Sequence, residues 1–454
     1  MATKTIKTKS PKRVKPELAG GFRDYRPADS ILKQRLIQKI RKTFEDFGFD
    51  PIDTPAVERT EVLLGGEKES DKVIFRVAPS TGKESKDIKQ GELALRFDLT
   101  VPLARFIAAN PEIPKPFKRY QIGNVWRGES PQAGRYREFT QADIDIVGSS
   151  SREADAEIIA VAYQVFRNIG LNKFIIKLNN RKVLNGLHAF VGFPEKKLWD
   201  VLRIIDKKDK VGREGVVKEL TKAIKKKATE KVMTLFDITG DAKTKLLSAR
   251  EFFGKESPAD EGIRELADIA RTLNAMGLDQ KNWEIDFSVV RGLGYYTGPV
   301  FEIVLTGTPG LGSVGGGGRY DTLLVPFTGQ TIPAVGISFG IDRLFTSLEK
   351  LELLKKKQTV TKALILNLSE DLRPAYLEFA QKLRAANINT SLYLGDDRAF
   401  QAQLAYAAKS EIPLVLIYGE EEKRKGLVTV KMMATREQKE IPAGNLVEFL
   451  KSRP

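Results

Sequence analysis

The chain has 454 residues, and 75 Lys and Arg against 59 Asp and Glu give it a formal net charge of +16 at pH 7. That length suits about three domains, and the excess of positive charge favours a polyanionic partner such as nucleic acid. Cysteine is absent and His188 is the only histidine. This excludes disulfides, thiol nucleophiles, zinc sites built from Cys or His, and Ser-His-Asp chemistry. Catalysis must use Arg, Lys, carboxylates, Tyr, backbone groups or Mg²⁺, and no apolar run is long enough to span a membrane.

Composition divides the chain into successive regions. Residues 1–20 are rich in Lys and predict a disordered basic tail, with RNA affinity or targeting as open alternatives to a merely solvated tail. Residues 21–350 mix helices and strands and contain a Lys- and Glu-rich helical insertion over about residues 172–277. Residues 351–360 form a predicted linker. In residues 361–454, strands alternate with helices, which indicates a small α/β domain.

Two runs, 117–129 and 137–148, predict a β-hairpin with a polar face. Period-two counting places on one face of the first strand Arg119, Gln121, Gly123, Val125, Arg127 and Glu129, and on one face of the second Phe139, Gln141, Asp143, Asp145 and Val147. A solvated sheet face would show the same pattern. However, an Arg and a carboxylate opposite an aromatic ring and a Gln/Asp pair can recognise phosphate, base and amine together.

The run AVGISFGIDRL (334–344) predicts a strand with one bulky and one nearly bare face. Val335, Ile337 and Phe339 alternate with Ala, Gly and Ser, so a flat ligand could lie on the bare face. Asp342 and Arg343 open a helix predicted over 344–354, which would put a guanidinium beside an anion site. A strand packed tightly against a helix is the alternative.

Two glycine-rich segments, 291–303 and 313–321, flank that region. Ordering each consecutive glycine costs about 1 kcal/mol or more, so the GGGG stretch predicts a loop that lets a ligand approach the backbone. The chain has neither a GxxxxGK[ST] motif nor a GxGxxG motif opening a helix, which excludes a P-loop and a Rossmann dinucleotide site.

The run ALRFDLTVPLARF (94–106) predicts a short strand that ends before a helix. Thr100, followed by Val101 and Pro102, has the pattern of a helix N-cap, so a structural role for Thr100 stays open. Asp98 is the stronger candidate to bind a ligand.

The segment 117–148 resembles motif 2 of class II aminoacyl-tRNA synthetases, 334–344 resembles motif 3, and a helix followed by GFDPIDTP (48–55) resembles motif 1. RGLGYYTG and GGGGRYD resemble the two signature segments of the histidyl-tRNA synthetase family. The resemblance implies an α+β fold, with a class II synthetase-type antiparallel sheet catalytic domain, a helical insertion and a C-terminal α/β anticodon-binding domain. It also implies a cytoplasmic homodimer whose interface uses the segment around Pro55.

The reaction implied by the resemblance is activation of L-histidine by ATP with Mg²⁺, followed by transfer to the 3′ end of tRNA(His). No protein-bound zinc, other metal ligand or membrane partner is expected. The family's catalytic cations would be Arg291, Arg127 and Arg343. ATP would be held by Arg127 at the α-phosphate, Glu129 at the adenine amino group, Phe139 stacked on the base, and Arg343 over its other face.

The resemblance also implies two further groups of site residues. The histidine amino group would contact Asp98, Thr100 and Gln141, and the imidazole would be lined by Asp145, Tyr295 and Tyr296, with Tyr320 at the edge of the pocket. The acceptor end of the tRNA would meet Gln132 and Arg135. His188 lies outside every motif and is expected to be structural or at the surface.

The residue inventory suits this reaction, because nucleotidyl transfer needs positioning and cationic stabilisation of phosphoryl charge rather than Cys or His. One alternative is a non-catalytic regulatory subunit of ATP phosphoribosyltransferase, and another is an RNA-binding sensor built on an inactive synthetase core. The first would lack the C-terminal domain and Arg291, and the second would show loss of Arg127, Arg291 or Arg343. All of these features are present in the sequence.

Overall fold

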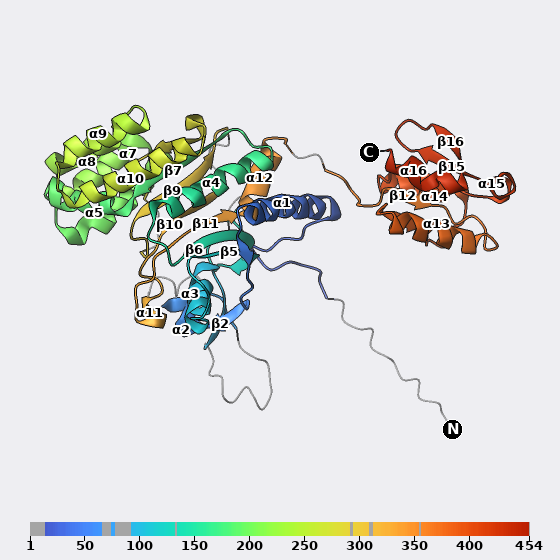
Figure 1. Cartoon of the computed structure of the whole chain (residues 1–454), viewed down its shortest axis with the longest axis horizontal. Coiled ribbons are helices and arrows are strands. Elements are labelled where there is room, and N and C mark those ends of the chain that lie inside the picture. Colours follow the sequence, from blue (N-terminus) through green and yellow to red (C-terminus); the bar gives the residue numbers. More distant parts are fainter. Residues whose placement is uncertain are drawn as a thin grey trace, which may run out of the picture. The chain divides into compact units, whose positions relative to one another are not determined.

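The computed structural model describes residues 14–65, 74–77, 92–131, 134–290, 294–307, 312–353 and 356–453. The chain forms two compact units (Figure 1): Met1–Arg23 with Leu36–Leu353, and Asp24–Arg35 with Leu354–Pro454. The first helix, α1 (Pro27–Asp46), contributes to both units.

An eight-stranded sheet forms the centre of the larger unit. Its strand order is β1 (Asp50–Pro51), β5 (Phe117–Trp126), β6 (Glu138–Val147), β11 (Ala334–Gly340), β10 (Gly315–Arg319), β9 (Pro299–Leu305), β7 (Phe174–Asn180) and β8 (Trp283–Ile285). All inner neighbours from β5 to β7 pair antiparallel, and only the outermost pairs β1–β5 and β7–β8 are parallel. The antiparallel sheet predicted from the sequence is therefore confirmed.

One face of this sheet is apolar and is covered by helices. Val335, Ile337 and Phe339 are at most 2% exposed, as the alternation in the sequence predicts. The Phe339 ring lies 5.9 Å from Phe44 of α1 and 6.1 Å from Phe166 of α4 (Arg152–Asn168). These contacts place both helices on the same face.

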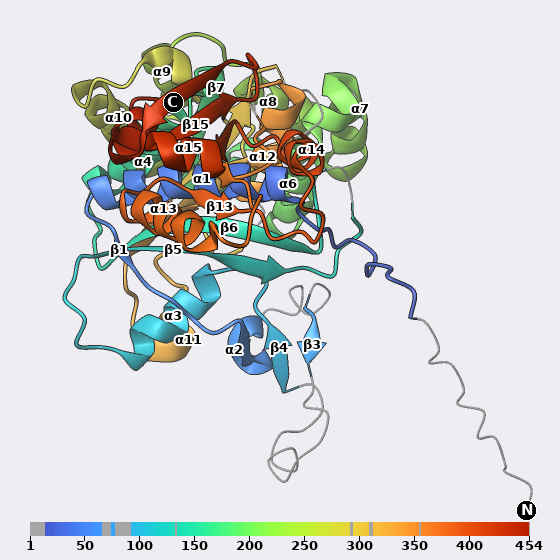
Figure 2. The same ribbon diagram turned by 90° about the vertical axis from the view of Figure 1, so that its right-hand side faces the viewer.

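A smaller layer lies on the other side of β5 and β6 from α1 (Figures 1 and 2). It contains a three-stranded sheet and three helices: β2 (Val57–Arg59), β4 (Leu93–Leu95), β3 (Arg76–Val77), α2 (Thr60–Leu64), α3 (Thr100–Ala109) and α11 (Val325–Thr328). Leu63, Ala94, Phe97 and Val101 form its buried cluster.

Six α-helices follow β7, in the range where the sequence predicts a helical insertion. They are α5 (Arg181–Val191), α6 (Leu198–Asp206), α7 (Lys208–Ile224), α8 (Lys226–Phe236), α9 (Ala242–Phe253) and α10 (Pro258–Ala275). In α6, Leu198, Val201, Leu202 and Ile205 are buried at helical spacing, so one stripe of the helix faces the local core. His188 lies in α5, partly buried, with its ring 6.4 Å from Phe193.

The smaller unit is an α/β sandwich with apolar clusters on both faces of its sheet. The strand order is β13 (Thr390–Leu392), β12 (Ala363–Ile365), β14 (Leu414–Ile417), β15 (Leu427–Met432) and β16 (Gln438–Pro442). β12 pairs parallel with β13 and β14, and the remaining pairs are antiparallel. Residues of α13 (Arg373–Ala385) and α16 (Leu446–Lys451) pack in one cluster, whereas Ala407 of α14 (Phe400–Lys409) packs in the other.

Three local predictions were wrong. The GGGG stretch is not a loop, because Gly315–Arg319 form β10. The helix α12 spans Ile341–Lys350 rather than 344–354. Its first turn is held by a contact with β6, because Asp342 Oδ2 accepts the Thr140 backbone N–H at 2.6 Å. Thr100 is the first residue of α3 rather than its N-cap, and Asp98 instead accepts the Val101 N–H at 3.1 Å.

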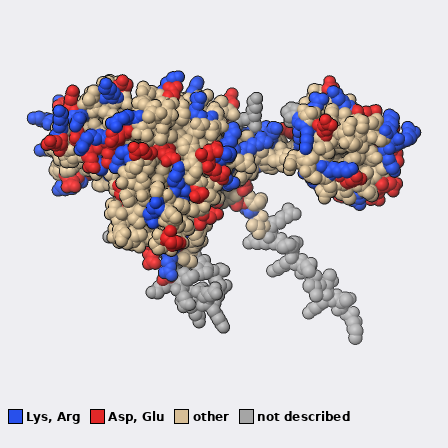
Figure 3. Space-filling model, viewed as in Figure 1, with Lys and Arg blue, Asp and Glu red and all other residues tan. Residues whose placement is uncertain are grey.

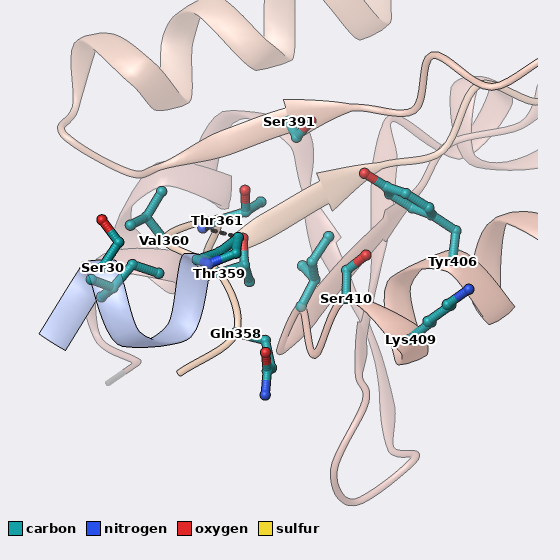
Figure 4. A pocket seen from close by; sticks show the side chains of 12 residues that line it. Ser30, Gln358, Thr359, Val360, Thr361, Ser391, Tyr406, Lys409 and Ser410 are labelled. Atoms are coloured by element: carbon teal, nitrogen blue, oxygen red, sulfur yellow. Dashed lines mark hydrogen bonds between the residues drawn. The ribbon is translucent and has the colours of Figure 1, made fainter. Parts of the chain in front are cut away.

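A shallow pocket lies within the smaller unit (Figure 4). Hydroxyl side chains account for much of its lining, with Ser30 from α1, Thr359 and Thr361 before β12, and Ser410 after α14. Among the described residues, no helix is long and apolar enough to cross a membrane.

Candidate active site

The face of the large sheet opposite α1 and α4 carries the polar side chains that the hairpin pattern predicts. The strand register aligns three rows across β5, β6 and β11: Arg119–Asp145–Gly336, Gln121–Asp143–Ser338 and Gly123–Gln141–Gly340. Because residues two apart on a strand share a face, all nine positions lie on the same side of the sheet. The polar face predicted from period-two counting is thus present, and most of its polar side chains are buried rather than solvated.

Glycines on this face make room for neighbouring side chains. A Cβ atom on Gly336 would lie 1.9 Å from Oδ1 of Asp145, and a Cβ atom on Gly318 would lie 2.9 Å from the Tyr296 ring. Only glycine fits at either position without a shift of its neighbours. The bare face of β11 and β10 therefore accommodates a carboxylate and a phenol of the site itself.

Asp145 is held from two sides. Its Oδ2 lies 2.6 Å from Nη2 of Arg119, and the two side chains are 4% and 0% exposed. The Tyr320 hydroxyl donates a hydrogen bond to Oδ1. Burial raises the pKa of Asp145, while the Arg119 charge and the Tyr320 hydrogen bond oppose that rise. Arg119 is a residue of this site that the sequence did not nominate, although the period-two pattern placed it on this face.

Three tyrosines form an aromatic wall beside Asp145. The ring of Tyr295 lies 4.9 Å from that of Tyr296 and 5.9 Å from that of Tyr320. Burial raises the pKa of Tyr295 and Tyr320 well above the usual range, so both phenols stay protonated as hydrogen-bond donors. The structure brings together the three tyrosines that the sequence nominated.

Acceptor groups gather next to this wall. Asp98 is 4% exposed, and burial raises its pKa to about 6 against the opposing Val101 hydrogen bond and the Arg127 and Arg119 charges. Gln141 donates through Nε2 to the Ser338 hydroxyl. Asp143, on β6 between Gln141 and Asp145, is 2% exposed, and burial raises its pKa to about 7. Asp143 and Ser338 are further residues that the sequence did not nominate for a role.

The side chains nominated for ATP lie at the adjoining end of the hairpin. The guanidinium carbon of Arg127 is 5.1 Å from the centre of the Phe139 ring, and Nε donates to the Phe97 carbonyl at 2.9 Å. Glu129 forms an ion pair with Arg135. In α12, Arg343 Nη1 donates to the Ser313 carbonyl at 2.7 Å.

Two nominated residues, Arg291 and Gln132, lie outside the described part of the chain. Thr100 is partly buried at the start of α3. Within the described ranges, no group of three or more His, Cys, Asp or Glu side chains is placed to hold a metal ion.

Comparison with known proteins agrees with this geometry. The family model described as histidyl-tRNA synthetase matches residues 21–344, and that of an anticodon binding domain matches residues 362–453. The histidine–tRNA ligase of Wolinella succinogenes is 40% identical over 435 residues, which cover 94% of this chain and 96% of that protein. That of Aeropyrum pernix is 40% identical over 443 residues, covering 96% and 97%.

The crystal structure of histidyl-tRNA synthetase from Nostoc sp. PCC 7120 covers 97% of this chain and 100% of its own, with a TM-score of 0.86 and 33% identity. This chain belongs to the histidyl-tRNA synthetase family. A structure described as an ATP phosphoribosyltransferase regulatory subunit/histidyl-tRNA synthetase from Bacillus halodurans C has a TM-score of 0.72 at 24% identity, which is a likeness of fold alone. The regulatory alternative is not favoured, because the anticodon-binding match is present and the named ligases align over nearly the whole chain.

Proposed function

We propose that the polar face of the large sheet carries out the reaction of this family, the ATP-dependent ligation of L-histidine to tRNA(His). The observation that carries the proposal is the buried constellation of Asp145, Tyr320 and Arg119 beside the tyrosine wall. A carboxylate that is already oriented can accept a hydrogen bond from an imidazole N–H. An apolar side chain of similar shape would leave these buried polar groups unpaired, which penalises its binding strongly.

ATP would bind at the hairpin end of the face. Phe139 would stack on adenine and Glu129 would accept from its amino group, while Arg343 would cover the other face of the base and reach toward the γ-phosphate. In the present structure Arg127 lies over the Phe139 ring. Adenine therefore takes this place only when the guanidinium moves to the α-phosphate. Mg²⁺ would arrive with the ATP phosphates and neutralise part of their charge.

Histidine would lie between the tyrosine wall and the acceptor groups. Asp145 would contact the imidazole together with Tyr295 and Tyr296, with Tyr320 at the pocket's edge, and Asp98, Thr100 and Gln141 would contact the amino group. The substrate carboxylate would then attack the α-phosphorus of ATP, and pyrophosphate would leave. Arg127 and Arg291 would stabilise the charge that develops at the α-phosphate.

Transfer to tRNA would follow at the same face, when a terminal ribose hydroxyl attacks the adenylate carbonyl and AMP leaves. Gln132 and Arg135 are the proposed contacts to the acceptor end, and the unit matched by the anticodon-binding model would read the anticodon. Lys and Arg are spread over the helical region and the smaller unit in Figure 3, and Lys218, Lys222 and Lys226 are exposed there. Such side chains can neutralise RNA phosphates.

We also propose a cytoplasmic homodimer. β1 is an edge strand of the large sheet and exposes Pro51, and the segment that follows it exposes Pro55 and Val57. An exposed edge with apolar side chains is a natural surface for a second copy. Sedimentation analysis of the purified protein would show the mass of two chains, and a stable monomer would contradict this part of the proposal.

The ligation itself is tested by charging tRNA transcripts with labelled histidine. We expect histidine to be attached to tRNA(His) and not to a transcript with a different identity. Charging of neither transcript by folded protein would contradict the proposed function.

A further inference from the structure

Four buried acceptor oxygen atoms of the site face have no hydrogen-bond partner among the described residues, and one of them, Oδ2 of Asp145, lies in the ion pair with Arg119. The other three are Oδ2 of Asp98, Oε1 of Gln141 and Oδ1 of Asp143. Their side chains belong to residues that are at most 6% exposed. Buried polar atoms in native proteins are nearly always paired, so an unpaired set within one site needs an explanation.

The three groups converge on one place. Gln141 and Asp143 are two residues apart on the same face of β6. Ser338 joins them, because it accepts from Gln141 Nε2 and its hydroxyl also acts on the Asp143 carboxylate. Asp98 is near enough for its negative charge to contribute to the raised pKa of Asp143.

Asp98 and Asp143 also lack an ion-pair partner among the described residues. The charged groups that act on Asp143 are Arg119 on β5, Asp145 on β6, Asp98 before α3 and Arg96 after β4. Arg119 is already paired with Asp145 at 2.6 Å, although its Nε and Nη1 are also buried without a hydrogen-bond partner, and Arg96 donates to the backbone carbonyls of Thr54 and Asn124. The Arg127 charge opposes the rise in the pKa of Asp98, but its Nε donates to the Phe97 carbonyl. The Asp98 and Asp143 carboxyl groups therefore remain buried without an ion pair among the described residues, which is costly when they ionise.

A substrate ammonium group would supply the hydrogen-bond donors and the positive charge that Asp98, Gln141 and Asp143 lack. It carries one positive charge and three N–H donors, which equals the number of acceptors that lack both a hydrogen bond and an ion pair. We propose that Asp143 contacts the α-ammonium group of the amino acid together with Asp98 and Gln141, and that it makes the site reject histidine analogues that lack this amine. The inference rests on the proposed function and adds to it a second carboxylate and a criterion of selectivity.

The test uses the full-length Asp143→Asn variant, which keeps the size of the side chain and removes its charge. Histidine-dependent ATP–pyrophosphate exchange gives KM for histidine and for ATP. Two competitive inhibitors separate the contributions of the amine and the carboxylate of histidine to binding. Histidinol has the amine without the carboxylate, and imidazole-4-propionate has the carboxylate without the amine.

We expect KM for histidine and Ki for histidinol to rise on the order of 10- to 100-fold, as for loss of one partner of a buried charge pair. KM for ATP and Ki for imidazole-4-propionate should stay within about twofold, because neither ligand presents an amine to this position. Equal weakening of both inhibitors would show a general structural role for Asp143 and overturn the proposal, and so would an unchanged Ki for histidinol.

A measurement on wild-type protein serves if the variant does not fold. Calorimetric titrations at about pH 7, in two buffers of different ionisation enthalpy, count the protons released on binding. The protons that each free ligand's own imidazole loses on binding are subtracted using the measured pKa of that ligand. Histidinol should then release more protons than imidazole-4-propionate, since only its ammonium group forces the nearby carboxyl groups to ionise. Equal release would overturn the proposal. Wild-type protein without any histidine-dependent exchange would instead contradict the proposed function.

Discussion

Arg119 and Asp145 form an ion pair of 2.6 Å on adjacent antiparallel strands, and neither side chain is more than 4% exposed. Asp145 also accepts from Tyr320. A buried carboxylate stays ionised only when a cation and hydrogen bonds compensate for its lost hydration. Arg119 is therefore a positioning residue, because its charge opposes the rise in the pKa of Asp145 and its ion pair holds the carboxylate at the place proposed for the imidazole.

Replacement of Arg119 by Met should lower the free energy of unfolding by about 3–5 kcal/mol, because it leaves Asp145 buried without its partner. Urea unfolding measures the change. Lys42→Met is the matched control, since Lys42 pairs with Asp46 on the exposed surface of α1, and such exposed pairs add little to stability. An Arg119→Met protein as stable as the control would contradict the role of the pair.

Gly336→Ala should lower kcat/KM for histidine by about 100-fold, the scale of a displacement of about 1 Å in a positioned group. The new methyl group would meet Oδ1 of Asp145, 1.9 Å from the ideal Cβ position. Steady-state exchange kinetics measure the effect. Gly444→Ala is a suitable control, because no atom lies within 4 Å of its Cβ position. Wild-type kinetics for Gly336→Ala would show that the Asp145 carboxylate does not need its present position.

Arg291→Ala should leave histidine binding largely intact and slow adenylate formation by about 100- to 1,000-fold or more, the scale of losing a key charge stabiliser. Calorimetry measures the binding, and rapid-quench kinetics measure the chemical step. Arg271→Ala controls for loss of a surface guanidinium, since that side chain is 78% exposed. Near-normal turnover of Arg291→Ala would exclude the assigned role.

The buried carboxyl groups predict how stability depends on pH. The pKa values of Asp98 and Asp143, raised to about 6 and about 7 from 3.8, mean that the native protein binds more protons than the unfolded chain between those limits. The free energy of unfolding of ligand-free protein should therefore fall as pH rises through this window. Asp143→Asn should weaken this trend and be more stable than wild type at about pH 8. Urea unfolding from about pH 4 to pH 8 measures both effects. If the free energy of unfolding of the variant depended on pH as that of the wild type does, the raised pKa of Asp143 would be contradicted.

Much of the site's arrangement is encoded in local periodicity. Alternation along 117–126 and 138–147 placed Gln141, Asp145 and Phe139 on one face, and the antiparallel register then set them opposite residues of β5. The smaller unit was predicted for the same reason, because its buried strands and helices have clear patterns. It also contains α15 (Glu420–Lys425) and β16, which were missed because both are polar and almost wholly exposed.

Contacts between distant segments could not be predicted in the same way. The Arg119 partner depends on the pairing of β5 with β6, and the start of α12 depends on Asp342 meeting the backbone of β6. The GGGG stretch looked like a loop because glycine has little strand propensity. It forms a strand because it pairs with both β9 and β11. Glycine is required in it because a Cβ on Gly317 would come 2.0 Å from the Gly336 carbonyl oxygen, and Gly318 lies against Tyr296. A single sequence shows neither the contact of Gly317 with the Gly336 carbonyl nor that of Gly318 with Tyr296.

The proposed function is tested most directly by ATP–pyrophosphate exchange with purified protein and Mg²⁺, with each of the twenty amino acids supplied separately. We predict exchange with histidine alone, because in the proposed site an imidazole would pair with Asp145 beside the tyrosine wall while an ammonium group would meet the acceptors next to them. Exchange with a different amino acid, or none with any amino acid from folded dimeric protein, would contradict it.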